Sequence, residues 1–271
     1  RNANVRLLRA VRYVQQANVD GVAITGDITD DGDGYELVLA AFERWRARGA
    51  LYAVPGNHDR YLFPISGSTR PKPTPESKAA AWRKFAESLD LPLEPSCAWV
   101  KVVPNASVIL LGLDTCARPQ RRFFRHNGAV GPEQLAFARA VGSRPEWKNA
   151  RHRVILLHHH VVPLPHGVGK RAPSEIGMRL DDAQGAAETF DAIGATLVMH
   201  GHRHISEERQ PAGVGFRLLA APSLTLGCRS GDGPSFWRVE LGDHVYATRV
   251  RVPIQAIDED EAEPEGELEP M

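Results

Sequence analysis

The chain has 271 residues, of which 42% are hydrophobic, and it carries 33 basic and 33 acidic residues. This length and apolar content suit one enzyme-sized domain with a substantial core. No apolar run approaches the roughly eighteen residues that a membrane-spanning helix needs, which argues against a helical membrane protein.

Apolar periodicity and breaker residues predict alternating helices and strands. Helices are expected near residues 2–17, 34–48, 76–88, 132–141 and 181–193. Strands are expected near residues 21–25, 51–54, 98–103, 107–113, 153–157, 195–199, 214–220, 235–241 and 244–252. This alternation with a β-rich end predicts an α/β fold in which helices cover two packed sheets.

The net charge of zero combines two opposite parts. Residues 258–269 hold eight acidic residues and no basic one, so the rest of the chain has 33 basic and 25 acidic residues. We expect a folded domain over residues 1–255 and a disordered acidic tail over residues 256–271, because the tail has almost no apolar residues. The basic body is compatible with a phosphate-bearing substrate.

The three cysteines, Cys97, Cys116 and Cys228, are widely spaced and form no CxxC pair. An odd number in this arrangement is typical of reduced thiols rather than of disulfides or a metal site. The sequence therefore predicts a cytoplasmic protein.

Four polar clusters each follow an apolar, strand-like run. They are GDITDDG at 26–32, PGNHDR at 55–60, LLHHHVVP at 156–163 and MHGHRH at 199–204. Strands that end together at one sheet edge would bring these Asp, Asn and His side chains into one pocket. Oxygen and nitrogen ligands without a thiolate suit Mn, Fe, Zn or a mixture of these ions better than a structural zinc.

Together the four clusters resemble those of the calcineurin-like metallophosphoesterases, which hydrolyse phosphate esters with two metals. The resemblance covers most of the chain and implies a four-layer αββα sandwich of two mixed sheets flanked by helices. The family opens with an Asp-x-His block after a first strand, and this chain has none. Because the chain also begins at Arg1 rather than Met, we expect that its natural N-terminus, with one strand and two metal ligands, is missing.

The resemblance implies a ligand set for two divalent ions. Asp27 would bridge the ions. Asn57, His158 and His202 would join it on one ion, and His204 on the other. By itself an Asp after a strand is more often a turn residue or a helix cap, so this role depends on the resemblance.

Two groups of histidines leave a choice open. The position directly after a strand favours His158 as the ligand, with His159 as the alternative, because a shift of one residue turns a side chain to the opposite face. If His159 is not a ligand, we expect it beside or behind the ligands. His202 and His204 are two residues apart, so in an extended segment both would leave the same face.

The resemblance also implies roles for the residues beside the ligands. His58 would contact the phosphate and assist the leaving group as a general acid. Asp59 would orient neighbouring groups without binding the metals itself. Asp30 and Asp31 are interpreted as turn or helix-capping residues rather than as ligands. His200 is expected to pack behind the site, and surface or loop positions are expected for His126, His152, His166 and His244.

The resulting hypothesis is a dinuclear phosphohydrolase in which a hydroxide held between the metals attacks phosphorus in line. The strings LGLDT at 111–115 and GAVGPEQLAF at 128–137 are most similar to the bacterial branch that contains cyclic-nucleotide and glycerophosphodiester phosphodiesterases. We therefore expect a small-molecule, nucleotide or lipid-headgroup phosphodiester as substrate, rather than a monoester.

Several alternatives remain open at this stage. Arg118 and Arg122 would hold a second phosphate or belong to a solvated basic loop. A nuclease would need interleaved stacking aromatics, and only Phe123 and Phe124 lie in that loop, so no nucleic-acid partner is expected. A degenerate binding scaffold is supported by the absent Asp-x-His block and opposed by the filled later ligand positions. Homo-oligomers are compatible with the sequence.

Overall fold

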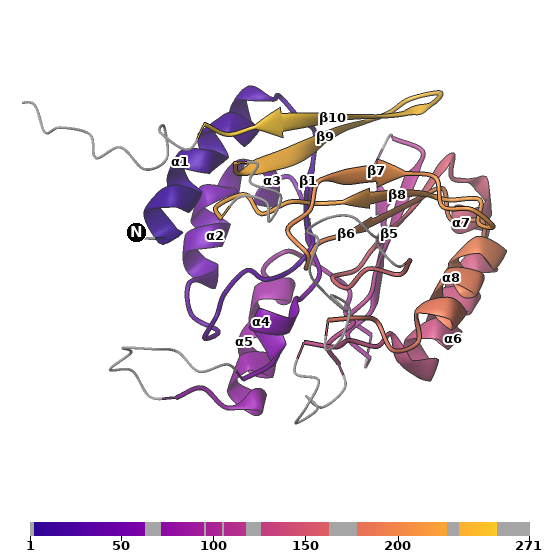
Figure 1. Cartoon of the computed structure of the whole chain (residues 1–271), viewed down its shortest axis with the longest axis horizontal. Coiled ribbons are helices and arrows are strands. Elements are labelled where there is room, and N and C mark those ends of the chain that lie inside the picture. Colours follow the sequence, from indigo (N-terminus) through magenta and orange to yellow (C-terminus); the bar gives the residue numbers. More distant parts are fainter. Residues whose placement is uncertain are drawn as a thin grey trace, which may run out of the picture.

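The structure is a computed structural model that describes residues 3–62, 72–94, 96–104, 106–117, 126–162, 178–226 and 233–253. Helices and strands alternate along these residues and end in a pair of antiparallel strands (Figure 1). The predicted acidic tail and Cys228 lie outside the described residues, whereas Cys97 and Cys116 are buried free thiols.

A six-stranded mixed sheet forms the centre of the fold (Figure 1). In spatial order its strands are β3 (Trp99–Val103), β4 (Val108–Gly112), β5 (His152–Leu156), β6 (Leu197–His200), β8 (Arg217–Ala220) and β7 (Glu207–Arg209). The four inner strands are parallel, and the edge strands β3 and β7 are antiparallel to their neighbours. The carboxyl ends of the inner strands therefore share one edge of the sheet.

Two separate strand pairs form a second β layer. β1 (Val22–Ile24) pairs parallel with β2 (Leu51–Ala53), and β9 (Ser235–Leu241) pairs antiparallel with β10 (Val245–Arg251). In the described part of the chain no ladder joins the pairs, which corrects the expectation of a second mixed sheet. β1 and β2 are connected through helices and so can run parallel, whereas the short turn between β9 and β10 imposes antiparallel pairing.

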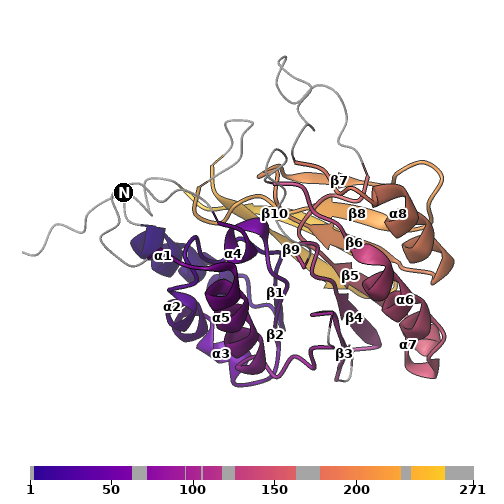
Figure 2. The same cartoon turned by 90° about the horizontal axis from the view of Figure 1, so that it is seen from below.

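Helices cover both outer faces of the β layers (Figure 2). Beside β1 and β2 lie α1 (Ala3–Gln16), α2 (Tyr35–Ala41), α3 (Glu43–Arg46), α4 (Asn57–Arg60) and α5 (Pro75–Glu87). On the far side of the six-stranded sheet lie α6 (Gly131–Gly142), α7 (Pro145–Asn149) and α8 (Ala183–Ala192). The predicted α/β architecture, a mixed central sheet flanked by helices, is confirmed.

Alternate residues of the inner strands enter two hydrophobic cores. Leu110, Val154 and Leu156 face the core shared with β1, β2 and their helices. Ile109 and Ile155 face the core beneath α6, α7 and α8. Parallel strands that are buried on both faces must be apolar on both, so the polar clusters follow the strands instead of interrupting them.

Two indole N–H groups join the β layers. Trp99 Nε1 donates to Ala53 O over 3.0 Å, and Trp237 Nε1 donates to Ala220 O over 2.9 Å. The Trp99 ring lies over Gly112, where a Cβ atom would approach it to 2.1 Å. The first bond holds the end of β2 against the central sheet, and the second holds β9 against β8.

The structure differs from the sequence prediction at several elements. The predicted helix 34–48 is interrupted at Phe42, whose φ of −105° and ψ of 19° leave the helical region, and it becomes α2 and α3. The sequence does not predict α7 or β7, because each is too short for a periodic signal. His152 is not a surface histidine: β5 begins there, the ring is buried, and its Nε2 lies 2.7 Å from Gly242 O.

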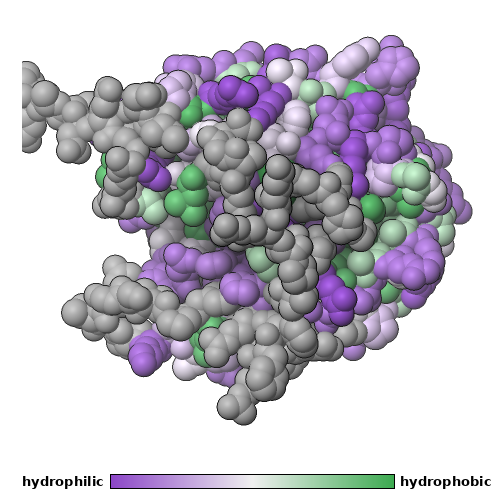
Figure 3. All heavy atoms as spheres, viewed as in Figure 1, coloured by the Kyte–Doolittle hydropathy of each residue, from purple (hydrophilic) through white to green (hydrophobic). Residues whose placement is uncertain are grey.

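The described residues on the face shown in Figure 3 are mostly hydrophilic, and their hydrophobic patches are scattered. Isolated exposed apolar residues of this kind are normal for a globular protein. Among the described residues, no helix combines the length and the apolar character needed to cross a membrane.

Candidate metal centre

Four strand ends bring the predicted ligands to one edge of the fold. Asp27 follows β1, Asn57 follows β2 and opens α4, and His158 follows β5. His202 and His204 follow β6. The carboxyl ends of parallel strands are frequent ligand sites in α/β proteins.

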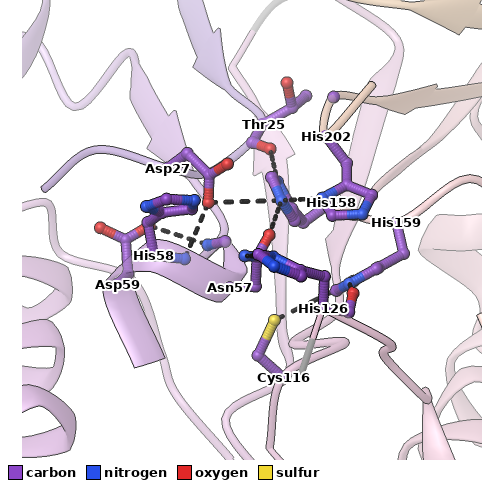
Figure 4. A network of polar contacts seen from close by, with 12 residues as sticks. Thr25, Asp27, Asn57, His58, Asp59, Cys116, His126, His158, His159 and His202 are labelled. Carbon is purple, nitrogen blue, oxygen red and sulfur yellow. Dashed lines mark hydrogen bonds and ion pairs between the residues drawn. The ribbon is translucent and has the colours of Figure 1, made fainter. Parts of the chain in front are cut away.

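Three of these side chains converge on a fourth, His158 (Figure 4). Its Nε2 atom lies 2.9 Å from Asn57 Oδ1, 3.1 Å from His202 Nδ1 and 3.3 Å from Asp27 Oδ1. Donor atoms that surround one ion at about 2.1 Å lie about 3.0–3.4 Å from one another. The three distances from His158 Nε2 are in this range, and the ligand atoms of Asp27, His158 and His202 all lie within 4.8 Å of one another, so a metal ion could bind among them.

The contact of the other ring nitrogen of His158 determines which of its two nitrogens can bind a metal. Nδ1 lies 2.7 Å from Thr25 O, a hydrogen-bond acceptor, so Nδ1 carries the proton and Nε2 keeps its lone pair. Asn57 Oδ1 and Asp27 Oδ1 also present lone pairs to the same point. A positive charge among these atoms would satisfy them, and a bound divalent metal ion would supply it.

The charges around the cluster support the same interpretation. Burial by itself would raise the pKa of Asp27, but His158 and His58 hold that pKa well below its usual range. Burial opposes the charged form of His158, yet Asp27 raises its pKa above the ordinary value. Burial and neighbouring imidazoles, His159 first, hold the pKa of His202 well below its usual range. His202 is thus a neutral imidazole, the form that binds metals.

Two glycines allow the ligand loops to approach one another. A Cβ atom on Gly56 would lie 2.2 Å from the backbone nitrogen and from Oδ1 of Asp27. A Cβ atom on Gly26 would lie 2.6 Å from His158 Nδ1, and Gly26 has a φ of +94°. The GD and PGNHD strings need glycine at these positions because backbone and ligand side chains are in direct contact there.

Asp59 connects the two loops that carry Asp27 and Asn57. This fully buried carboxylate accepts hydrogen bonds from the backbone N–H groups of Ile28, Thr29 and Gly56 and from the Tyr35 hydroxyl, at 2.8–3.1 Å. It thereby joins the loop after β1 to the loop after β2. Its hydrogen-bond partners are thus backbone groups of these loops and the Tyr35 hydroxyl.

His58 forms a close pair with Asp30. Its Nδ1 lies 2.6 Å from Asp30 Oδ1, and its backbone N–H donates to Asp27 Oδ1 over 3.0 Å. Burial would lower the pKa of His58, but the hydrogen bond to Asp30 and the charge of Asp27 raise it. The interpretation of Asp30 as a turn or capping residue is therefore corrected, because its carboxylate is the partner of His58. Asp31 does act in the turn, accepting from the Asp33 N–H.

His159 lies beside the cluster with both ring nitrogens engaged elsewhere. Its Nδ1 is 2.7 Å from Thr115 Oγ1, and its Nε2 is 2.7 Å from His126 O. Burial holds its pKa well below the ordinary value, so the ring is neutral. Of the residues in the histidine run, His158 supplies the nitrogen that meets Asp27, and His159 lies behind it.

The predicted extended geometry of the last cluster is wrong. His202 and His204 have φ values of 70° and 50°, in the left-handed region, because β6 ends at His200 and the chain turns at once. Asp27, His158 and His202 each place one ligand atom within 4.8 Å of the others. His204 is not in that group, but it lines the same cavity as Asp27.

The cavity above the cluster has a volume of about 130 Å³. It is lined by Asp27, Asn57, His58, His126, Met178, His202 and His204. His126 lies in a turn, as predicted, and also borders the site: its Nδ1 lies 3.3 Å from Asn57 Nδ2, and the amide Oδ1 faces His158. The sequence offers no signal for this, since no strand or motif residue precedes His126.

Some sequence predictions remain without a structural counterpart. Arg118, Arg122 and His166 lie outside the described residues. Conversely, sequence reasoning misses Lys78, a fully buried lysine on α5 that contacts both ligand loops. A lysine in an amphipathic helix is ordinarily solvated, so only the packing reveals its position.

Comparison with protein families gives one broad match. A family model described as calcineurin-like phosphoesterase matches residues 2–206, which include every residue of the cluster. A manganese-dependent ADP-ribose/CDP-alcohol diphosphatase from Arabidopsis thaliana is 27% identical over 233 residues. This alignment covers 75% of the present chain and 71% of the plant protein.

Solved structures provide a likeness of fold alone. The purple acid phosphatase PPD1 from yellow lupin (Lupinus luteus) has a TM-score of 0.52 at 14% identity, over 79% of this chain and 38% of its own. The phosphopantetheinyl hydrolase PptH from Mycobacterium tuberculosis has a TM-score of 0.48 at 13% identity, over 80% of this chain and 84% of its own. The chain thus spans less than two fifths of the lupin enzyme.

Proposed function

Since this chain belongs to the calcineurin-like phosphoesterase family, we propose that it is a metal-dependent phosphohydrolase that cleaves phosphodiester or diphosphate bonds of small molecules. The observation that carries the proposal is the convergence of Asp27, Asn57 and His202 on His158 Nε2, with spacings that fit one ion. Burying several acceptor atoms together costs free energy unless a cation binds among them, and a protein that binds no metal would gain nothing from that cost.

The proposed cofactor is a pair of divalent ions, with manganese first because the Arabidopsis diphosphatase is manganese-dependent. Asp27, Asn57, His158 and His202 would hold one ion, and His204 would serve the second together with Asp27. When bound, the ions would supply positive charge to the phosphoryl oxygens and activate water for attack.

His58 is the proposed general acid. Its Nδ1 is occupied by Asp30, and the residue lines the cavity next to Asp27 and Asn57. A protonated ring would donate from Nδ1 to Asp30 and from Nε2 to the departing oxygen of the substrate. The raised pKa keeps a larger fraction of the ring protonated near neutral pH.

The proposed substrates are small diesters, with diphosphate diesters first. A cavity of about 130 Å³ suits a phosphoryl group whose substituents extend outward. The plant relative is a diphosphatase for ADP-ribose and CDP-alcohols, so we place these compounds before cyclic nucleotides and glycerophosphodiesters.

The test is hydrolysis by the purified protein with added Mn. ADP-ribose, a CDP-alcohol and bis-nitrophenyl phosphate should be cleaved faster than the monoester nitrophenyl phosphate, and chelation should abolish turnover. The variant Asp27→Asn serves as the inactive control. Bound metal with no turnover of any ester would favour the binding-scaffold alternative, and a faster monoester reaction would overturn the preference for diesters.

A further inference from the structure

Lys78 is buried completely, although lysine is among the residues least often buried. Its ammonium group has three N–H donors and no acceptor. Nζ donates to Asp30 O over 2.8 Å, to Tyr61 O over 2.6 Å and to His58 O. Each donor is thus matched by one backbone carbonyl oxygen.

The three carbonyl groups come from two loops that the sequence separates. Asp30 belongs to the loop after β1, and His58 and Tyr61 belong to the segment after β2. Two of the three acceptors are the backbones of the residues whose side chains form the 2.6 Å pair of His58 with Asp30. Lys78 therefore bonds to both partners of that pair at once, from a helix outside the ligand clusters.

We propose that Lys78 is a positioning residue that holds His58 and Asp30 together, so that the imidazole of His58 is directed at the substrate. The inference rests on the proposed leaving-group role of His58. Burial of an ammonium group is costly, and an apolar side chain of similar length would avoid that cost. A methionine at this position would avoid that cost but would take the shared donor away from three carbonyl groups, because joining them at one point requires a tripod of donors.

The experiment compares Lys78→Met with Lys84→Met, because Lys84 is exposed on the same helix. The substrates are bis-nitrophenyl phosphate and diphenyl phosphate, assayed with Mn. Phenolate is the poorer leaving group, so diphenyl phosphate depends more on a correctly placed acid. We expect Lys78→Met to lose on the order of 10²-fold in kcat on diphenyl phosphate, the scale of a small misplacement, and much less on bis-nitrophenyl phosphate. Lys84→Met should match the wild type on both.

Two further variants separate positioning from stability. Lys78→Arg is used if the methionine variant does not fold, because it keeps the positive charge. Its planar guanidinium cannot donate in three directions from one atom, so this variant should show the same selective loss. In the double variant Lys78→Met/His58→Ala the loss should be about that of His58→Ala alone, because both changes remove one function. Equal losses on the two substrates, or additive losses in the double variant, would overturn the proposal.

A proton NMR measurement keeps the inference independent of turnover. The short bond from His58 Nδ1 to Asp30 should give a downfield imidazole N–H signal that disappears in His58→Ala. That signal should weaken in the Lys78 variants and persist in Lys84→Met. If His58→Ala leaves the ratio of the two substrates unchanged, the proposed role of His58 fails; an unaltered signal in the Lys78 variants shows instead that Lys78 does not position the pair.

Discussion

His158 Nε2 lies 2.9 Å from Asn57 Oδ1, an acceptor, and in a neutral ring Nε2 is also an acceptor because Nδ1 donates to Thr25 O. Two acceptors at this distance repel each other unless a positive charge lies between them. A metal ion satisfies both atoms, and in its absence a second proton on His158 does so. The affinity of this site for a metal should therefore depend on each of the two residues.

The first prediction concerns metal binding. Asn57→Ala and His158→Ala should each lower the Mn content of the purified protein and remove the increase in melting temperature that Mn produces in the wild type. The reason is that each variant removes one proposed ligand of the same ion. His244→Ala is the control, because His244 is exposed and distant from the cluster in sequence. Unchanged Mn affinity in both site variants would contradict the assigned ligands.

The second prediction concerns His58. His58→Ala should retain Mn and lose on the order of 10²–10⁴-fold in turnover of diphenyl phosphate, the usual scale for a general acid. Steady-state kinetics with metal analysis on the same sample measure both quantities. Bis-nitrophenyl phosphate should show a smaller loss, since nitrophenolate departs without help. Wild-type turnover of diphenyl phosphate by this variant would exclude His58 from the reaction.

The third prediction concerns pH. The hydrogen bond to Asp30 and the charge of Asp27 raise the pKa of His58 despite burial. If the reaction needs protonated His58, turnover falls as pH rises through that pKa. Asp30→Asn removes a carboxylate that raises the pKa, so the fall should occur at lower pH. A profile of kcat against pH measures the shift. If kcat of Asp30→Asn falls at an unchanged or higher pH, the decline belongs to a group other than His58.

The fourth prediction concerns stability. Asp59 accepts four hydrogen bonds while fully buried. Asp59→Asn replaces one acceptor oxygen by a donor facing other donors, which should cost about 2–4 kcal/mol of the free energy of unfolding. Urea unfolding monitored by circular dichroism measures this difference. Asp33→Asn, an exposed change in the neighbouring loop, should have little effect. A decrease in the free energy of unfolding below about 0.5 kcal/mol would show that the hydrogen bonds of Asp59 do not stabilise the two loops.

Local pattern in the sequence was sufficient for most elements and for the place of each polar cluster. The helix at Ala3–Gln16 and the strand at Ser235–Leu241 follow the periodicity of their apolar residues closely. The glycines of the GD and PGNHD strings indicate tight turns, because glycine tolerates close backbone approach. These features depend on neighbours within a few residues, which is the range over which sequence alone is informative.

The tertiary structure alone decided which side chains meet across long sequence separations. Asp30 and His58 are 28 residues apart, and Lys78 reaches them from a third segment. His126 approaches Asn57 from 69 residues away, and His202 and His204 adopt left-handed backbone angles where an extended run was expected. The physical reason is that a pairing between distant segments is determined by packing and burial, which leave no periodic trace in the sequence. The sequence determined the residue types of the candidate ligands, and the fold determined their partners and orientation.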